Sequence, residues 1–470
     1  MRRVATLLLL CWPALALADE PKPFDPVGIW EGSLDLGMRK LKLAFKITKA
    51  EDGSLKGTMD AVTQGAKDIP VASVKVEDGQ LNFDLTKIGA TYSGKPAVDG
   101  QSVKGTWKQS GHEFELELKR VAKVSEAKRP QHPVKPYPYR EEEVTVDNPA
   151  AKDVKLAGTI TWPTGKGPFP AVVLITGSGP QDRDETVFDH KPFLVLADHL
   201  TRNGIAVLRC DDRGVGKSTG SMKDATTADF ATDAYACVKF LQTRSEIDRK
   251  HIGLAGHSEG GLIAPMVAAE HPDEIGFIVM LAGTGLPGDE VLIHQSAALR
   301  RAMKTEGKKF ELGSRLQAAY MKAARETKDP KVLAEQIRVF MDSLPPEDAK
   351  HIASADKKDN ETQCEALCSP WVQYFIHCDP RASLKKVRCP VLAINGELDL
   401  QVTPKENLPA IEGALKEAGN KDVTVRVFPG LNHLFQHCKT GMPNEYGEIE
   451  ETMSPEVLDV ITQWIIKRKS

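Results

Sequence analysis

Apolar and polar residues alternate with a period of two in the first part of the chain. The run 41–47 follows this pattern, and it returns at 71–76, 81–85 and 114–118. Turn-forming Asp-Gly pairs lie between several of these runs. Short strands at this spacing predict a small antiparallel all-β domain, a barrel or a sandwich, over residues 24–121.

Two glycine-led segments near the ends of this domain, Gly28-Ile29-Trp30 and Gly105-Thr106-Trp107, predict matched strand starts. In a barrel, the two tryptophans could line a ligand site or fill the core. We favour the core interpretation, and this domain contains no candidate catalytic group.

From residue 141 onward, continuous apolar runs alternate with amphipathic stretches of helical period. The predicted strands are 144–146, 156–162, 171–176, 205–210, 251–256, 277–282, 390–395 and 423–428. The predicted helices are 193–202, 228–243, 262–270, 407–418 and 455–467. This alternation predicts an α/β domain over residues 141–470, with a mostly parallel eight-stranded sheet covered by helices on both faces.

Two segments interrupt these patterns. Residues 285–388 show only helical periodicity. This stretch is much longer than the roughly dozen residues that a crossover between parallel strands needs. They predict a helical cap insertion, about 286–385, over the carboxyl end of the sheet. Residues 122–140 are rich in proline and predict an extended, fairly stiff linker between the two domains.

The first eighteen residues have the features of a secretory signal peptide. Arg2 and Arg3 precede a short apolar run that ends in Ala16-Leu17-Ala18. The run is shorter than the roughly 20 residues that cross a bilayer. We expect cleavage after Ala18 and a periplasmic or secreted protein, in preference to lipid attachment at Cys11.

Composition narrows the possible partners. The chain is 41% hydrophobic and 27% charged, with a formal net charge of −3, which argues against disorder and against general attraction to nucleic acid. Seven cysteines follow the signal peptide, an odd number, and no obligatory disulfide is expected. The chain contains no CxxC pair, and no histidine pair has metal-ligand spacing, so we expect no metal and no cofactor.

The segment Gly256-His257-Ser258-Glu259-Gly260 fits the nucleophile-elbow pattern G-x-S-x-G. It follows a predicted strand and opens a predicted helix, which is the context that the motif requires. The glycines leave room for a strained turn that exposes the serine hydroxyl. Ser258 is therefore the predicted nucleophile.

A serine nucleophile needs a base in contact with it and an acid behind the base. In this architecture, the acid follows a late strand and the histidine follows the last one. We predict Asp399 as the acid, in preference to Glu397. We predict His433 as the base, in preference to His437, which lies a turn further on.

The oxyanion hole needs two backbone N–H groups. One is expected from Glu259, the residue after the nucleophile. The other is expected from the glycine-rich turn after the strand 171–176, at Ser178 or Gly179.

A second glycine-rich segment, Asp211-Asp212-Arg213-Gly214-Val215-Gly216-Lys217-Ser218, ends like a phosphate-binding loop. Asp211 stands where that loop needs glycine, and the two aspartates would repel phosphates, so we exclude nucleotide binding. We expect Arg213 to pair with an acid and to brace the loops around the site.

Three acids lie beside the presumed oxyanion turn. They are expected either to hold Arg183 or Arg213 or to bias the site towards cationic substrates. These acids are Asp182, Asp184 and Glu185.

Four motifs together resemble the EstD-type bacterial carboxylesterases of the α/β-hydrolase superfamily. They are Gly177-Ser178-Gly179-Pro180-Gln181, the 212–218 segment, 256–261 and Gly430-Leu431-Asn432-His433. The resemblance covers residues 141–470 and implies an α/β-hydrolase fold. It also implies a triad of Ser258, Asp399 and His433, with Ser178 and Glu259 as oxyanion donors.

The resemblance implies a serine hydrolase that cleaves small carboxylic esters through an acyl-enzyme, and the signal-peptide features imply that it is exported. The resemblance extends to serine aminopeptidases and acyl-peptidases, which remain the alternative; Glu290, Glu306 and Glu311 are candidates for binding a substrate ammonium group. A binding protein with an inert hydrolase fold is the third interpretation. The sequence indicates neither a nucleic-acid partner nor a membrane span, and it leaves the oligomeric state open.

Overall fold

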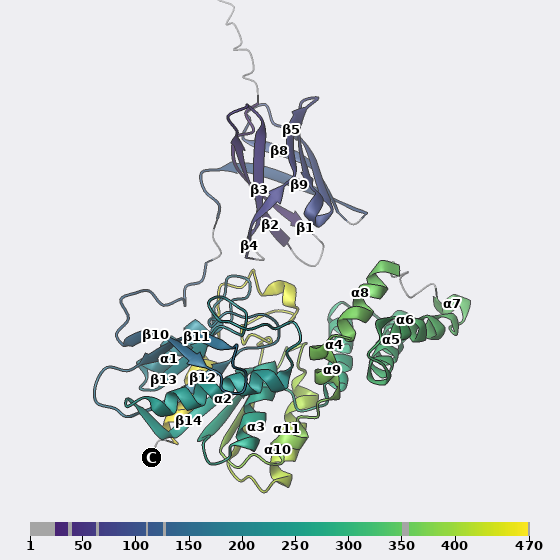
Figure 1. Cartoon of the computed structure of the whole chain (residues 1–470). Helices are drawn as coiled ribbons and strands as arrows, with labels where there is room; N and C mark the ends of the chain where they lie inside the picture. The colour runs from purple at the N-terminus through teal and green to yellow at the C-terminus, as the bar shows by residue number, and fades with distance from the viewer. Residues whose placement is uncertain are drawn as a thin grey trace, which may run out of the picture. The chain divides into compact units, whose positions relative to one another are not determined.

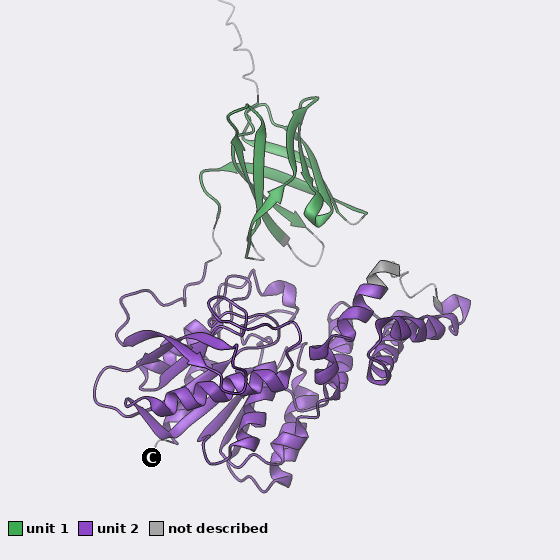
Figure 2. Ribbon diagram, in the orientation of Figure 1, with its two compact units in different colours: residues 1–126 green, residues 127–470 purple. Residues whose placement is uncertain are grey.

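The computed structural model describes residues 24–35, 40–62, 65–109, 111–125, 128–349 and 357–468. The chain divides into two compact units, residues 1–126 and 127–470 (Figure 2). The expected signal peptide, residues 1–18, lies outside the described residues.

The first unit is a nine-stranded sheet in which every neighbouring pair of strands is antiparallel. The strands are β1 (Gly28–Asp35), β2 (Lys40–Lys49), β3 (Leu55–Ala61), β4 (Ala66–Val71), β5 (Ser73–Glu77), β6 (Gln80–Leu85), β7 (Ala90–Pro96), β8 (Ser102–Gln109) and β9 (His112–Val121). Their order is β4-β3-β2-β1-β9-β8-β7-β6-β5. The predicted antiparallel all-β domain is confirmed.

Aromatic side chains fill the interior of this sheet. Trp30, Trp107 and Phe45 are each at most 1% exposed, so both tryptophans belong to the core, as predicted. The expected strand start at Gly105 is wrong, because this residue lies inside β8 opposite Gly94. The strands approach so closely there that a Cβ on Gly105 would lie 2.2 Å from a backbone oxygen.

The second unit contains the predicted eight-stranded, mostly parallel sheet. Its strands are β10 (Arg140–Asp147), β11 (Lys155–Trp162), β12 (Phe169–Ile175), β13 (Ala206–Cys210), β14 (Ile247–His257), β15 (Phe277–Leu281), β16 (Val391–Gly396) and β17 (Val423–Phe428). Their order is β10-β11-β13-β12-β14-β15-β16-β17, and only the pairs β10–β11 and β11–β13 are antiparallel. All eight predicted strands are present.

Helices cover both faces of this sheet. They are α1 (Pro192–Arg202), α2 (Thr227–Thr243), α3 (Glu259–Glu270), α11 (Pro404–Glu417) and α12 (Pro455–Ile466). Helices α2, α3 and α11 bury apolar side chains in one core cluster, and α1 and α12 do so in another. The continuous apolar runs of the central strands arise because these strands are buried between the two clusters.

The long connection between β15 and β16 is helical, as predicted. It contains α4 (Gly288–Ala302), α5 (Gly307–Glu326), α6 (Pro330–Asp342), α7 (Pro346–Ala349), α8 (Lys357–Leu367), α9 (Pro370–His377) and α10 (Arg381–Leu384). Figure 1 shows α4–α9 grouped together, apart from the helices that flank the sheet. This cap has its own apolar core, which Leu262 of α3 joins.

The proline-rich segment before β10 packs against the second unit instead of standing free as a spacer. Arg129 donates hydrogen bonds to the carbonyl oxygens of Phe188 and Ile449, at 2.7 and 3.0 Å. The Gln131 amide donates to Met453 O at 2.7 Å. The sequence predicted only a stiff linker, because proline content indicates how stiff the backbone is and does not indicate which groups the side chains bind.

Candidate active site

Ser258 sits on a sharp turn between β14 and α3. Its backbone angles, φ 52° and ψ −114°, are in a region that non-glycine residues rarely adopt. The flanking glycines permit the turn: a Cβ on Gly256 would lie 1.9 Å from Gly260 O, and one on Gly260 would lie 2.1 Å from Ile175 O. Such strain, of order 1–3 kcal/mol, is characteristic of functional sites.

His433 and Asp399 lie on the loops that follow the last two strands of the sheet. His433 Nδ1 is 2.7 Å from Asp399 Oδ2, and both residues are buried. The other carboxylate oxygen, Asp399 Oδ1, accepts the backbone N–H groups of Gln401 and Val402 at 2.8 and 3.0 Å. Three donors therefore fix the orientation of this carboxylate.

The competing residues take other partners. Glu397 Oε2 accepts the Gly430 N–H at 3.0 Å, so this acid joins the two loops without contacting His433. The His437 side chain is 64% exposed and pairs with Glu451. Between the two candidate acids and the two candidate histidines, only Asp399 and His433 contact each other within the part of the chain that the structure describes.

His257 brings the nucleophile turn and the histidine loop together. Its ring centroid lies 4.7 Å from that of His433, and its Nε2 is 3.0 Å from His433 O. Because His257 precedes Ser258 directly, this contact places the serine turn beside the base loop.

The glycine-rich turn after β12 passes next to Ser258. A Cβ on Gly177 would lie 3.3 Å from Ser258 Cβ. The Gly177 N–H already donates to Glu185 Oε1 at 2.8 Å. Ser178 and Gly179, the next two residues, therefore stay the candidates for the oxyanion donor on this turn. The Glu259 N–H is in the first turn of α3, where backbone donors lack partners within the helix.

Arg213 braces the loops as expected, although its acid comes from α2. Its Nε donates to Asp233 Oδ2 at 2.7 Å, and both residues are buried. Arg183 pairs with Asp211 and Glu143.

The expected pairing of the three loop acids with Arg183 or Arg213 is wrong. Asp184 binds Arg209 and Lys191, and Asp182 accepts hydrogen bonds from its own loop. Glu185 binds His257. Sequence proximity suggested the arginines, whereas the fold presents each acid to a different strand or loop.

The sequence did not predict that the carboxyl groups of Glu259 and Asp212 are buried. Glu259 Oε1 accepts Thr227 Oγ1–H at 2.7 Å and the Trp371 indole N–H at 2.8 Å, which connects α3 to the cap helix α9. Burial raises the pKa of Glu259. Burial raises the pKa of Asp212 to about 7. The nearby charges of Glu185 and Glu259 also raise this pKa, whereas the hydrogen bonds from Thr176 and Gln181 lower it.

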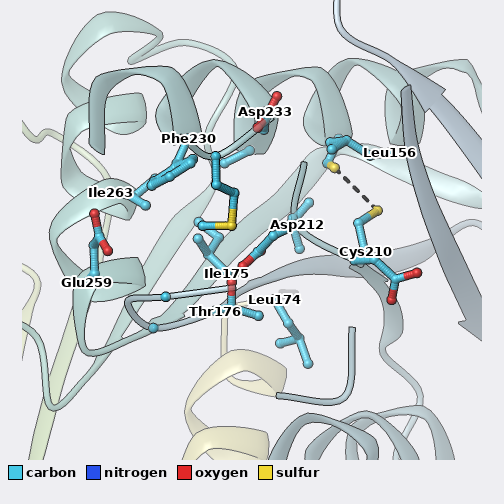
Figure 3. A pocket seen from close by; sticks show the side chains of 17 residues that line it. Leu156, Leu174, Ile175, Thr176, Cys210, Asp212, Phe230, Asp233, Glu259 and Ile263 are labelled. Carbon is cyan, nitrogen blue, oxygen red and sulfur yellow. Dashed lines mark hydrogen bonds between the residues drawn. The ribbon is translucent and has the colours of Figure 1, made fainter. Parts of the chain in front are cut away.

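A pocket beside the Gly177–Gly179 turn contains both acids (Figure 3). Apolar side chains such as Phe230 and Ile263 form much of its wall, and Cys210 lies at one side with its Sγ 3.6 Å from Cys237 Sγ. The pocket thus combines a largely apolar wall with carboxyl groups next to the candidate oxyanion turn.

Within the ranges given above, no group of three or more His, Cys, Asp or Glu side chains is arranged to hold a metal ion. No helix among those residues is both long and apolar enough to cross a bilayer.

Comparison with known proteins gives matches over most of the chain. A family model described as alpha/beta hydrolase fold matches residues 170–439. Esterase EstD of Thermotoga maritima is 27% identical over 450 residues, which cover 93% of this chain and 92% of that protein.

Solved structures are similar as well. Est1E from Butyrivibrio proteoclasticus with bound ferulic acid is 17% identical, with 69% of this chain and 99% of that chain covered and a TM-score of 0.40. Proline iminopeptidase from Mycobacterium smegmatis is 19% identical, with coverage of 70% and 98% and a TM-score of 0.42.

Proposed function

Because this chain belongs to the alpha/beta hydrolase fold family, we propose that it hydrolyses carboxylic esters with Ser258 as nucleophile, His433 as general base and Asp399 as the acid behind the base. The main support is the 2.7 Å contact between His433 Nδ1 and Asp399 Oδ2 beside a strained serine turn. The likeness to the EstD esterase over nearly the whole chain supports esters as the substrate class.

The environment of Asp399 determines which nitrogen of His433 carries the proton. An ionised carboxylate only accepts hydrogen bonds, so the proton of a neutral His433 ring stays on Nδ1. Nε2 then keeps its lone pair and can take the Ser258 proton. Asp399 also stabilises the imidazolium that this transfer creates.

The reaction proceeds in two halves. Ser258 Oγ forms a bond to the ester carbonyl carbon, the carbonyl electron pair moves onto oxygen, and the hydroxyl proton passes to His433. Collapse of this tetrahedral species expels the alcohol, which takes that proton and leaves an acyl-enzyme. Water then attacks with the same base, which releases the acid and restores Ser258.

Backbone N–H groups stabilise the oxyanion. Glu259 supplies one and Ser178 or Gly179 the other, since the Gly177 N–H is already engaged by Glu185. Each donor contributes about 3 kcal/mol to transition-state stabilisation.

The alternative of an aminopeptidase requires a carboxylate that binds the substrate ammonium. The three cap residues that are candidates for this role are all exposed: Glu290, Glu306 and Glu311. Their positions therefore do not favour that alternative over ester hydrolysis.

Kinetics with a serine probe test the proposal. We expect a fluorophosphonate to label Ser258 and the protein to hydrolyse p-nitrophenyl acetate. The substitution Ser258→Ala should abolish both, while Ser245→Ala, at an exposed serine of the same unit, should change neither. Turnover by Ser258→Ala within tenfold of the parent would contradict the assignment. Faster cleavage of aminoacyl-naphthylamides than of acyl esters would favour the peptidase.

We also propose that the chain is exported and that the mature protein begins at Asp19. The basic, apolar and small-residue segments of the first eighteen residues support this. Mass spectrometry of the protein from a periplasmic or culture fraction should give the mass of residues 19–470. Recovery of the uncut chain from the cytosol alone would contradict export.

A further inference from the structure

Glu185 and His257 form a buried pair next to the proposed catalytic residues. The two residues are 4% and 7% exposed. Glu185 Oε1 lies 2.9 Å from His257 Nδ1, and the same oxygen accepts the Gly177 N–H at 2.8 Å. On the other side of the ring, His257 Nε2 lies 3.0 Å from His433 O.

The partners of His257 define its protonation. A backbone carbonyl can only accept, so Nε2 must carry a proton. An ionised carboxylate oxygen also only accepts, so beside an ionised Glu185 the Nδ1 atom carries a proton as well. A neutral ring has a single N–H and would leave one nitrogen lone pair facing an acceptor oxygen. The contacts therefore fit an imidazolium beside a carboxylate.

The charged groups around the ring agree with this state. The loop after β12 presents Glu185, and the loops after β16 and β17 present Asp399 and His433. Burial opposes the charged ring, but the Glu185 charge, its hydrogen bond and the His433 carbonyl outweigh burial, so the pKa of His257 is raised. The buried cation thus has a counter-charge in direct contact.

The pair connects three segments that are distant in sequence. Glu185 holds the oxyanion turn through the Gly177 N–H, and His257 is covalently part of the nucleophile turn. His257 also holds the base loop through the carbonyl of His433 itself. Three of the segments that the reaction needs therefore meet at one ion pair.

We propose that Glu185 and His257 are positioning residues whose buried carboxylate–imidazolium contact fixes the oxyanion turn, the nucleophile turn and the base loop relative to one another. This inference rests on the proposed ester hydrolysis by Ser258, His433 and Asp399. Neither residue of the pair touches the reacting atoms. Their contribution lies in geometry, where an error of about 1 Å can cost about 10²-fold in rate.

Glu185→Gln is the informative substitution because an amide cannot supply both the contacts of Oε1 and the negative charge of the carboxylate. With its oxygen in that place, the amide keeps both hydrogen bonds but removes the counter-charge from the His257 cation. With its NH2 group there, the amide opposes the Gly177 N–H. The two loops should therefore separate or the ring should lose its proton.

A matched control lies on the same base loop. His437 Nδ1 is 2.8 Å from Glu451 Oε2, but the histidine side chain is 64% exposed. Glu451→Gln makes the same chemical change at a solvated pair. It should leave kcat and KM for p-nitrophenyl acetate unchanged.

The experiment combines kinetics of the full-length variants with NMR of the parent protein labelled with 15N-histidine. We expect Glu185→Gln to lower kcat about 10²-fold, with KM changed less than about threefold, in protein that is folded by circular dichroism. In the parent protein, both nitrogens of His257 should be protonated under the conditions of the kinetic assay.

Each outcome bears on the inference separately from the function. A Glu185→Gln variant with kcat within threefold of the parent would overturn the inference and leave the proposed function intact. A single protonated nitrogen on His257 would overturn it even if the variant failed to fold. A parent protein without esterase activity or Ser258 labelling would overturn the proposed function and the positioning role together.

Discussion

Replacing Asp399 by asparagine should invert the proton arrangement of His433. Asp399 Oδ1 accepts two backbone N–H groups, from Gln401 and Val402. In the variant, only the amide oxygen can take that place, because an NH2 group would face two donors. The amide NH2 must then face His433 Nδ1, where it can only donate. Nδ1 is thereby forced to accept, and the proton moves to Nε2.

A ring protonated on Nε2 cannot take the Ser258 proton. This tautomer error lowers kcat by about 10⁴-fold in serine hydrolases, which corresponds to about 5 kcal/mol of transition-state stabilisation. Stability should change little, because both backbone hydrogen bonds to residue 399 remain. We expect this loss in kcat/KM for p-nitrophenyl acetate, with a melting temperature near that of the parent.

Glu397→Gln is the matched control. This competing acid is exposed and accepts the Gly430 backbone N–H, a contact that the amide oxygen can keep. Its activity should stay within about threefold of the parent, since surface substitutions rarely have large effects. Activity of Asp399→Asn within tenfold of the parent would refute the role given to Asp399, and a large loss in Glu397→Gln would transfer that role to Glu397.

Two further predictions concern stability. Gly256→Ala should destabilise the protein by more than about 4 kcal/mol, because its Cβ would lie 1.9 Å from Gly260 O; Gly413→Ala in α11, with no atom within 4 Å, should stabilise it by up to about 1 kcal/mol. Equal urea midpoints would contradict this. Burial lowers the pKa of His190 to about 4, so the unfolded chain binds its proton first as the pH falls. Stability should therefore decrease by about 3 kcal/mol from pH 6.5 to pH 4. His190→Gln should lack this part of the pH dependence, whereas exposed His437→Gln should retain it.

The sequence was sufficient for the elements and for the order of the catalytic candidates. Continuous apolar runs of strand length predicted central strands such as β12, β15 and β16, because strands buried on both faces have few polar residues. The carboxyl ends of parallel strands lie at one edge of the sheet. Ser258, Asp399 and His433 could therefore be proposed as candidates from their places after strands, and the last two are in contact.

Contacts between distant segments could not be predicted in this way. His257 and Glu185 are 72 positions apart, and Trp371 and Glu259 are 112 apart. Periodicity describes which face of an element is buried, not which side chain it meets. The sequence contained only an indirect indication that His257 has a partner. His257 is a polar residue at the end of an otherwise apolar run, and such a residue needs a hydrogen-bond partner when it is buried.

The proline-rich segment determines where the catalytic unit can be separated from the β-domain. Arg129 and Gln131 donate to carbonyl oxygens of loops near His190 and the C-terminal helix, and Tyr139 OH donates to Asp198 at 2.9 Å. A truncated protein starting at Glu141 would lose these donors and expose the carbonyl groups that they now satisfy. A fragment starting near residue 127 would retain them, so an excised hydrolase domain should carry its own leading segment.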